Sequence, residues 1–414
     1  MKRRVVVTGI GAVTPIGNDA ATTWRSMLDG VSGGAPITRF DTAAFDVKFA
    51  CEVKGYDPLQ HMDRKEAKRA DLFTQFAVSA SYMAMQDAGL GDRFSGDADR
   101  LGVIIGSGIG GLKTFEEQHD VYRTRGPSKI SAFFIPMFIG DIAAGIVSMR
   151  FNAKGPNYAT VSACASSAHA IGDAYRAIQY GDADLMLAGG SEAAVTAMSV
   201  GGFANMKALS ARNDSPATAS RPFDATRDGF VMGEGGAVLL LEELEHAKAR
   251  GARIIAEIVG YGATGDAHHL TQPAPNGEGA QRAMKRALND AGATPGDVQY
   301  VNAHGTSTEA NDLNETRAIK AVFGDAAAQL NVSSTKSATG HMLGAAGAVE
   351  AMMCAYAIRD GIVPPTINYH TPDPELDLNY TPLKPVKRDV NVAISNSFGF
   401  GGHNVTLALR KYTG

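Results

Sequence analysis

The chain alternates strand-like and helical segments, and it does so twice in the same order. Strand-like apolar runs occupy residues 5–8, 101–105, 185–189 and 237–241, and a second set occupies 254–259, 298–302, 392–395 and 405–409. Strands that alternate with helical segments are typical of layered α/β proteins. The sequence therefore predicts an α/β fold made of two related halves.

Two short motifs support an internal duplication. Residues 161–164 (Val-Ser-Ala-Cys) match residues 332–335 (Val-Ser-Ser-Thr) at an offset of 171 residues, and the Gly-Gly pair at 235 matches the pair at 401 at an offset of 166. The opening strands, at residues 5 and 254, are 249 residues apart, so the first half should carry long insertions. We expect these largely between residues 30 and 70 and between 113 and 148. The predicted halves are residues 1–252 and 253–414, packed as one body with the active site at their junction.

Composition excludes several classes of function. The net charge of −4 gives no reason to expect nucleic acid or an anionic membrane as partner. The longest apolar stretch, residues 132–149, contains Pro136 and Asp141, so a buried wall or a subunit contact is the better interpretation. Three cysteines are too few for a disulfide framework, and no cleavage-site pattern follows the first residues. We therefore expect a cytoplasmic protein.

Cys164 is the candidate nucleophile. It lies between a β-compatible run and a helical segment over residues 168–180, which ends at Gly181. A cysteine at such a strand-to-helix elbow faces helix-end N–H groups, which stabilise a thiolate and lower the thiol pKa. Cys51 and Cys354 lack this setting and fit the commoner role of a small buried hydrophobic residue.

Two histidines lie in turns rich in Gly, Ser and Thr. His304 belongs to residues 302–308 (Asn-Ala-His-Gly-Thr-Ser-Thr), and His341 belongs to residues 336–344 (Lys-Ser-Ala-Thr-Gly-His-Met-Leu-Gly). Turns of this composition present side chains instead of packing them. A duplicated fold would unite Cys164 from one half with both histidines from the other, which predicts nucleophilic catalysis assisted by imidazoles.

These motifs resemble those of the β-ketoacyl–acyl carrier protein synthases of the elongating, synthase II type. The resemblance covers nearly the whole chain and includes residues 4–11, the glycine turn at 106–111 and the C-terminal motif at 396–404 (Asn-Ser-Phe-Gly-Phe-Gly-Gly-His-Asn). It implies a thiolase-like, duplicated five-layer α/β/α/β/α fold. Many relatives continue the His304 motif with Pro-x-Gly-Asp, whereas residues 309–312 here read Glu-Ala-Asn-Asp, a departure that concerns the local turn after Thr308.

The resemblance implies a decarboxylating Claisen condensation. Cys164 would carry the acyl group, while His304 and His341 would donate hydrogen bonds to the enolate of a malonyl thioester. Backbone N–H groups of Cys164 and Phe400 would form an oxyanion hole, in a turn where Gly399 and Gly401 allow a close approach and would themselves help to bind the substrate. An ion pair between Lys336 and Glu350 would brace the histidine loop.

The remaining implied roles concern substrate and partners. Thr306 and Thr308 would bind pantetheine amides, and the acyl chain would lie near Ile109, Phe134, Ile135, Met137, Phe203 and Phe400. Arg64, Lys65, Lys68 and Arg69 share one face if their segment is helical, where an acidic acyl carrier protein could dock; the alternative is a solvated charged face. Lys129 and Lys207 are further docking candidates. We expect acyl- and malonyl-loaded carrier protein as partners, a homodimer, and neither a cofactor nor a catalytic metal, with a structural cation left open.

Three alternatives remain to be weighed. A ketosynthase of a polyketide pathway would use the same three residues. A thiolase would need a second catalytic cysteine in the C-terminal glycine turn, which has none. A non-enzymatic partner subunit would have lost the nucleophile. The sequence leaves open the acyl chain length and which histidine serves which step.

Overall fold

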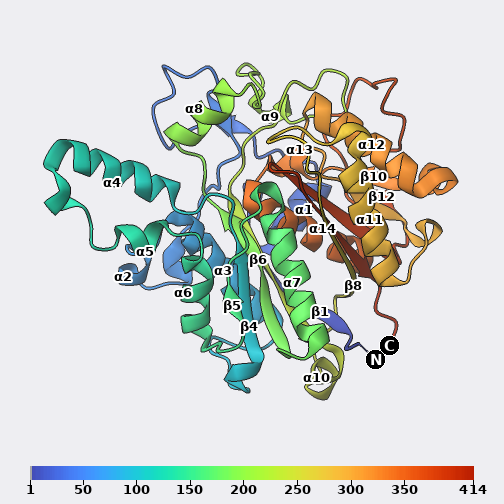
Figure 1. Cartoon of the computed structure of the whole chain (residues 1–414), viewed down its shortest axis with the longest axis horizontal. Coiled ribbons are helices and arrows are strands. Elements are labelled where there is room, and N and C mark those ends of the chain that lie inside the picture. Colours follow the sequence, from blue (N-terminus) through green and yellow to red (C-terminus); the bar gives the residue numbers. More distant parts are fainter. Residues whose placement is uncertain (1) are drawn as a thin grey trace.

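A single large sheet forms the frame of the protein (Figure 1). The computed structural model describes residues 2–414. Within these residues ten strands pair in the order β10 (Asn331–Ser333), β9 (Tyr300–Asn302), β13 (Val392–Gly399), β14 (His403–Arg410), β8 (Ala256–Gly265), β1 (Val5–Val13), β7 (Gly235–Glu243), β6 (Leu185–Glu192), β4 (Leu101–Gly106) and β5 (Asn157–Tyr158). Each predicted strand run falls on one of these strands, which confirms the α/β prediction.

The sheet confirms the internal duplication. Read outward from its centre, the first half runs β1-β7-β6-β4-β5 and the second runs β8-β14-β13-β9-β10. Corresponding pairs agree in direction: β1–β7 and β8–β14 are antiparallel, whereas β4–β6 and β9–β13 are parallel. The boundary at 252/253 stays a prediction; it falls between α10 (Leu244–Ala249) and β8.

Helices complete the five layers. The central layer contains α7 (Ser166–Tyr180) and α14 (Ala346–Asp360), which lie between the two sheet halves. Residues 346–358 of α14 are all buried, as expected of a helix that is apolar on every side. The outer layers are α3 (Leu72–Asp87) with α6 (Ile142–Phe151), and α11 (Glu278–Ala291) with α12 (Glu309–Phe323). The five-layer arrangement is therefore confirmed.

The first predicted insertions are present in the first half. Between β1 and α3 lie α1 (Ala20–Leu28), β2 (Ala35–Pro36), β3 (Phe49–Ala50), η1 (Pro58–Gln60) and α2 (Arg64–Ala67). Between β4 and α6 lie α4 (Leu112–Arg125), η3 (Pro127–Lys129) and α5 (Phe134–Phe138), which form an arm projecting from the body (Figure 1).

Two further insertions escaped the sequence comparison. The first half adds α8 (Ala197–Asn205) and α9 (Pro216–Ala219) between β6 and β7, and the second half adds β11 (Ile362–Val363) and β12 (Val386–Lys387) between α14 and β13. Because one lies in each half, they nearly cancel in the offset between the two copies. The remaining short elements are η2 (Ala98–Arg100), η4 (Ala163–Ala165), η5 (Pro275–Gly277), η6 (Pro295–Asp297), η7 (Gly324–Gln329), α13 (Lys336–Thr339) and η8 (Leu343–Ala345).

The apolar stretch at 132–149 is partly buried and partly exposed. On α6 it buries Ala143, Ala144 and Val147, whereas Ile135 and Met149 are 56% and 73% exposed. Among residues 2–414, none of the helices combines the length and the apolarity needed to cross a membrane.

Candidate active site

Cys164 lies in the 3₁₀ turn η4, directly before α7. The predicted elbow is longer than expected, because the preceding strand β5 already ends at Tyr158. Ala163 adopts the left-handed conformation, with φ at 50°, which costs a non-glycine residue energy. Two bonds hold this turn: the Ser166 hydroxyl donates to the Ala163 carbonyl at 2.7 Å, and it accepts the Ser162 N–H at 2.9 Å. The strained turn is therefore tied to the first residue of α7.

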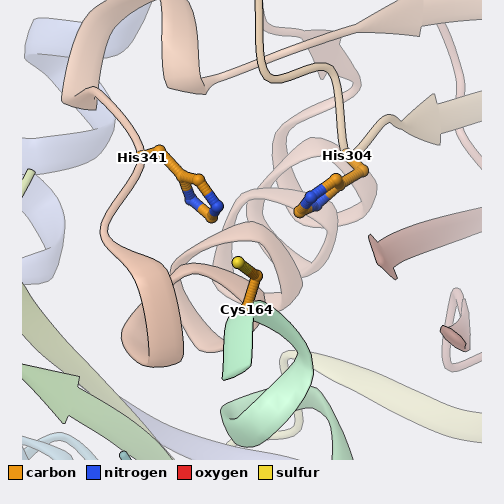
Figure 2. A group of neighbouring side chains, drawn as sticks. All are labelled: Cys164, His304 and His341. Atoms are coloured by element: carbon orange, nitrogen blue, oxygen red, sulfur yellow. The ribbon is translucent and has the colours of Figure 1, made fainter. Parts of the chain in front are cut away.

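The structure brings Cys164, His304 and His341 together (Figure 2). The cysteine sulfur and one ring nitrogen of each histidine lie within 4.8 Å of one another. The two imidazole rings are nearly perpendicular, with centroids 5.3 Å apart. Figure 2 shows both rings directed toward the sulfur, so a nucleophile from the first half faces two imidazoles from the second.

Backbone contacts position the two histidines. The N–H groups of His304 and Gly305 each donate to the carboxylate of Glu315 at 2.8 Å. The backbone N–H of His341 donates to the Val231 carbonyl at 2.7 Å, which attaches its loop to the first half. Glu315 is a functional neighbour that the sequence analysis missed, because nothing in the sequence pairs a helix glutamate with the turn before it.

A buried lysine sets the electrostatics of the site. Lys336 Nζ lies 3.3 Å from His304 Nδ1 and forms an ion pair with Glu350, with both side chains 2% exposed. Burial, together with the Lys336 charge, holds the pKa of His304 and of His341 well below its usual range. Both imidazoles are therefore neutral near pH 7. Burial raises the pKa of Glu350 to about 7, and Lys336 opposes this shift.

The expectation of a lowered thiol pKa at Cys164 is wrong. Burial raises the pKa of the Cys164 thiol to about 11, although Lys336 and the backbone N–H groups of Phe400 and Cys164 oppose the shift. Loss of solvent disfavours the thiolate more than these groups stabilise it. The resting site therefore holds a protonated thiol beside neutral imidazoles, and thiolate formation requires proton transfer to one of them.

A cavity of about 350 Å³ opens onto the cysteine. Its walls include most of the residues predicted to bind substrate, namely Ile109, Phe203, Thr306, Thr308, Gly399 and Phe400. The two threonine hydroxyls lie 2.9 Å apart. Phe230 and Leu343 also line the cavity, and sequence reasoning missed both, because buried apolar residues look alike in a sequence whichever wall they form.

The two predicted glycines behave differently. A Cβ on Gly399 would lie 2.7 Å from the Ser162 carbonyl oxygen and 3.2 Å from the Cys164 nitrogen, so the turn reaches the nucleophile only because this residue is glycine. Gly401 does not line the cavity, which corrects its assignment to substrate binding. With φ at 86°, it continues the turn and donates its N–H to the Leu270 carbonyl at 2.7 Å.

Three apolar residues expected near the acyl chain lie elsewhere. Phe134, Ile135 and Met137 belong to α5 and do not line the cavity. Phe134 instead packs with Phe115 of α4 inside the projecting arm, where the ring centroids are 6.4 Å apart. Within a single chain, the arm is therefore separate from the cavity wall.

The predicted docking residues are all exposed. Arg64 and Lys65 lie on α2 and Lys68 is its C-cap, so the segment forms a single helical turn that ends before Arg69. Arg69 follows and stacks over the Phe133 ring at 4.3 Å. Lys129 lies on η3 of the arm. Of the six residues, Lys207 alone lines the cavity.

The departure at residues 309–312 falls on the first turn of α12, after the histidine turn. Thr308 is the N-cap of α12, which begins at Glu309, where an acidic residue suits the positive end of the helix dipole. Asp312 accepts the Phe223 N–H at 2.8 Å. The motif after His304 therefore starts an ordinary helix.

The same three side chains are the one cluster of three or more His, Cys, Asp and Glu residues with metal-ligand spacing that residues 2–414 contain. Thiolate and neutral imidazole are ligands that zinc accepts. They are equally a nucleophile and two hydrogen-bonding groups at the end of a substrate-sized cavity, an arrangement suited to acyl transfer.

Comparison with known proteins agrees with this site. The model of the β-ketoacyl synthase N-terminal domain matches residues 2–247, and the model of its C-terminal domain matches residues 255–370. Two 3-oxoacyl-[acyl-carrier-protein] synthases 2, from Staphylococcus aureus (strain COL) and from Synechocystis sp. (strain ATCC 27184 / PCC 6803 / Kazusa), are each 55% identical to this chain, with 99% of both chains covered. The structure is similar to the ketosynthase of a type II polyketide synthase solved with its acyl-carrier protein, at a TM-score of 0.92 and 37% identity over the full length of both chains. The chain belongs to the β-ketoacyl synthase family.

Proposed function

We propose that this protein catalyses the decarboxylating Claisen condensation that elongates an acyl chain, as a 3-oxoacyl–acyl carrier protein synthase of type 2. The single observation that carries the proposal is the cavity-facing cluster of Cys164, His304 and His341, with its nitrogen and sulfur atoms within 4.8 Å. The full-length identity of 55% to curated synthases of this type supports the same reaction.

The first half-reaction loads the enzyme. The thiol of Cys164 transfers its proton to a neutral imidazole, and the sulfur attacks the carbonyl carbon of an acyl thioester. The N–H groups of Cys164 and Phe400, which face the sulfur, stabilise the tetrahedral oxyanion. The carbon–sulfur bond to pantetheine then breaks, and the departing thiolate takes the proton back. The acyl group remains on Cys164.

The second half-reaction forms the new carbon–carbon bond. A malonyl thioester loses carbon dioxide, and the electron pair of the broken carbon–carbon bond forms an enolate. The enolate oxygen accepts hydrogen bonds from His304 and His341. The enolate carbon attacks the acyl carbonyl on Cys164, and the carbon–sulfur bond breaks. The released Cys164 thiolate then takes a proton from solvent, which restores the resting thiol. Excluding water from the buried pocket prevents hydrolysis of the acyl-enzyme.

Acyl carrier protein delivers both substrates. We assign its docking to a basic docking surface formed by Arg64, Lys65, Lys68, Arg69, Lys129 and Lys207. Lys207 lies at the cavity itself, so the arm of a docked carrier protein could enter there. Thr306 and Thr308, which line the same cavity, offer hydroxyls to the pantetheine amides. No resident cofactor is needed, because the phosphopantetheine arrives with the carrier protein.

A homodimer is the second part of the proposal. The projecting arm and its surroundings expose Phe115 and Phe133 at 40% each, Ile135 at 56% and Met149 at 73%, and large exposed apolar areas mark interaction sites. A second copy would cover these side chains. Light scattering should give twice the chain mass, and Ile135→Asp should shift the protein toward monomer; a monomeric parent protein would contradict this part.

The alternatives have weaker support. The third cysteine, Cys354, is buried in α14 and donates to the Ile394 carbonyl, so it cannot serve as the second catalytic cysteine of a thiolase. A polyketide ketosynthase shares the chemistry, but the identity to the polyketide enzyme is 37%, against 55% to the curated synthases. The three described cysteines are all unpaired, which suits the cytoplasm.

Mass spectrometry of the intact protein mixed with acyl-carrier proteins from C4 to C18 tests the reaction. One acyl adduct should form, peptide mapping should place it on Cys164, and adding malonyl-carrier protein should release a β-ketoacyl product two carbons longer. Cys164→Ala should form no adduct. Acylation of Cys51 or Cys354, or full activity of Cys164→Ala, would exclude the proposal.

A further inference from the structure

Glu192 is a buried carboxylate that the mechanism does not use. It is the last residue of β6 and is completely inaccessible to solvent. Four donors converge on it. Ser107 Oγ lies at 3.0 Å, the N–H of Gly108 at 2.7 Å and the N–H of Ile109 at 3.2 Å, while the N–H of Gly344 reaches it from the other half at 3.0 Å.

Two glycines make this convergence possible. A Cβ on Gly108 would lie 2.9 Å from Glu192 Oε2, and a Cβ on Gly344 would lie 2.6 Å from the same oxygen. Real Cβ atoms do not approach an oxygen so closely, so the two backbones can reach the carboxylate only where the side chain is absent. One glycine follows β4 in the first half, and the other follows His341 in the second.

The segments joined by Glu192 both border the acyl cavity. Ile109 and Leu343, which lie next to the two glycines, are both lining residues. Gly108 also lies against the cysteine elbow, where its Cβ would be 3.4 Å from the Ala163 carbonyl oxygen. Leu343 has a left-handed backbone with φ at 47°, a conformation that a branched residue keeps only when its surroundings hold it.

The donor set favours an ionised carboxylate. Burial raises the pKa of Glu192, and its hydrogen bonds to Gly108, Gly344, Ser107 and Ile109 oppose this shift. The buried carboxylates of Glu242 and Glu350 pair with basic side chains, whereas Glu192 has no ion pair among the described residues. The negative charge of Glu192 is therefore stabilised mainly by hydrogen-bond donors from the two loops. The same hydrogen bonds fix the two loops relative to each other.

We propose that Glu192 is a positioning residue that sets acyl chain-length selectivity by clamping the Ile109 turn to the loop that follows His341. The inference rests on the proposed function, because it assigns a substrate preference to the same cavity. While the hydrogen bonds to Glu192 hold the two loops together, Ile109 and Leu343 keep their positions and fix the depth of the cavity. Without these bonds, the two side chains can move aside for longer acyl chains.

Glu192→Gln tests the clamp. The amide keeps the size of the side chain, but it replaces one acceptor oxygen with an N–H₂ group that faces the backbone donors. The measurement is the rate of acyl-enzyme formation at Cys164 for C4, C8, C12 and C16 carrier-bound chains, expressed as the ratio of the fastest to the slowest. We expect this ratio to fall about tenfold in Glu192→Gln, because bonds to a charged group are among the stronger ones.

Glu52→Gln is the matched control. Glu52 is also buried and accepts backbone N–H groups, from Thr38 at 3.0 Å and from Arg39 at 3.2 Å, but it does not line the cavity or contact the Ile109 turn. Its chain-length ratio should stay within about twofold of the parent's. An equal change in both variants would reduce Glu192 to a general stabilising residue and overturn the inference.

Ser107→Ala keeps the test decisive if Glu192→Gln does not fold. This change removes one of the four donors and should lower the same ratio in the same direction by a smaller factor. An unchanged ratio in the folded variants overturns the inference, as does a parent protein that loads all four chains at one rate. A parent protein that forms no adduct at Cys164 would instead refute the proposed function.

Discussion

Lys336 Nζ lies 3.3 Å from His304 Nδ1, inside the protein. An ammonium group can only donate, so the lysine donates to Nδ1 and leaves the ring proton on Nε2. His304 is thereby preset as a hydrogen-bond donor. His341 differs, because its Nδ1 is buried without a hydrogen-bond partner among residues 2–414. A hydrogen bond to Nδ1 therefore fixes the position of the ring proton in His304, and no such bond fixes it in His341.

Mutation should separate the two half-reactions, because the thiol carries the acyl group while the imidazoles serve the enolate. Cys164→Gln should abolish condensation yet leave, or enhance, malonyl decarboxylation, because the imidazoles remain. His304→Ala and His341→Ala should each reduce decarboxylation, by about 10²–10³-fold for loss of one preorganised donor. Release of carbon dioxide from malonyl-carrier protein measures this step alone. Decarboxylation at the parental rate in either alanine variant would remove that histidine from the enolate site.

Alkylation of Cys164 should depend steeply on pH. The thiol pKa is raised to about 11, so the thiolate fraction rises about tenfold for each pH unit below that value. The rate with iodoacetamide should therefore climb between pH 7 and 9 without a plateau. Lys336→Met should slow the reaction throughout this range, because the lysine charge favours the thiolate.

Two observations check this assignment. Cys164→Ala should resist alkylation, since Cys51 and Cys354 are buried and burial raises the pKa of each thiol. A rate that levels off near neutral pH in the parent protein would show that the helix end dominates after all.

Reversing charge on the basic docking surface should weaken carrier-protein binding. Changing Lys65, Lys68 and Arg69 to glutamate should raise KM for carrier-bound substrates and flatten its dependence on salt, because attraction between exposed charges is screened within about 8–10 Å. Activity toward short pantetheine thioesters is the internal control and should change little. Equal losses on both substrate types would point to damaged folding or chemistry.

Ile109→Phe should shorten the accepted chain. Ile109 lines the cavity, and its β-branch leaves little freedom about χ1, so added volume has to displace neighbours at a cost of about 1–3 kcal/mol. If the long-chain acyl-enzyme alone bears this cost, the bias is about 5- to 150-fold. Loading by C4 and C6 chains should persist, while loading by C10 and longer chains should be lost. A uniform decline over all lengths would make Ile109 an ordinary core residue.

Most of the fold could be predicted from local patterns in the sequence. Apolar runs bounded by glycine turns mark the strands, and matching motifs in the two halves mark the duplication, because strand periodicity and turn chemistry are local properties. The insertions at α8 and at β11–β12 stayed hidden for an equally simple reason. Each half received one, so the spacing between matched motifs hardly changed.

The sequence around the catalytic residues was enough to identify them, but it did not give their protonation or their hydrogen-bonding roles. Cys164, His304 and His341 stand in turns whose composition is visible residue by residue, so the sequence alone determined which groups meet and what chemistry they suit. Only the tertiary structure decided the high thiol pKa, the donor role of His304 and the Glu192 clamp. These properties depend on burial and on contacts between the two halves. Loss of water changes the free energy of each charged group, and no local sequence pattern shows which distant residues come into contact.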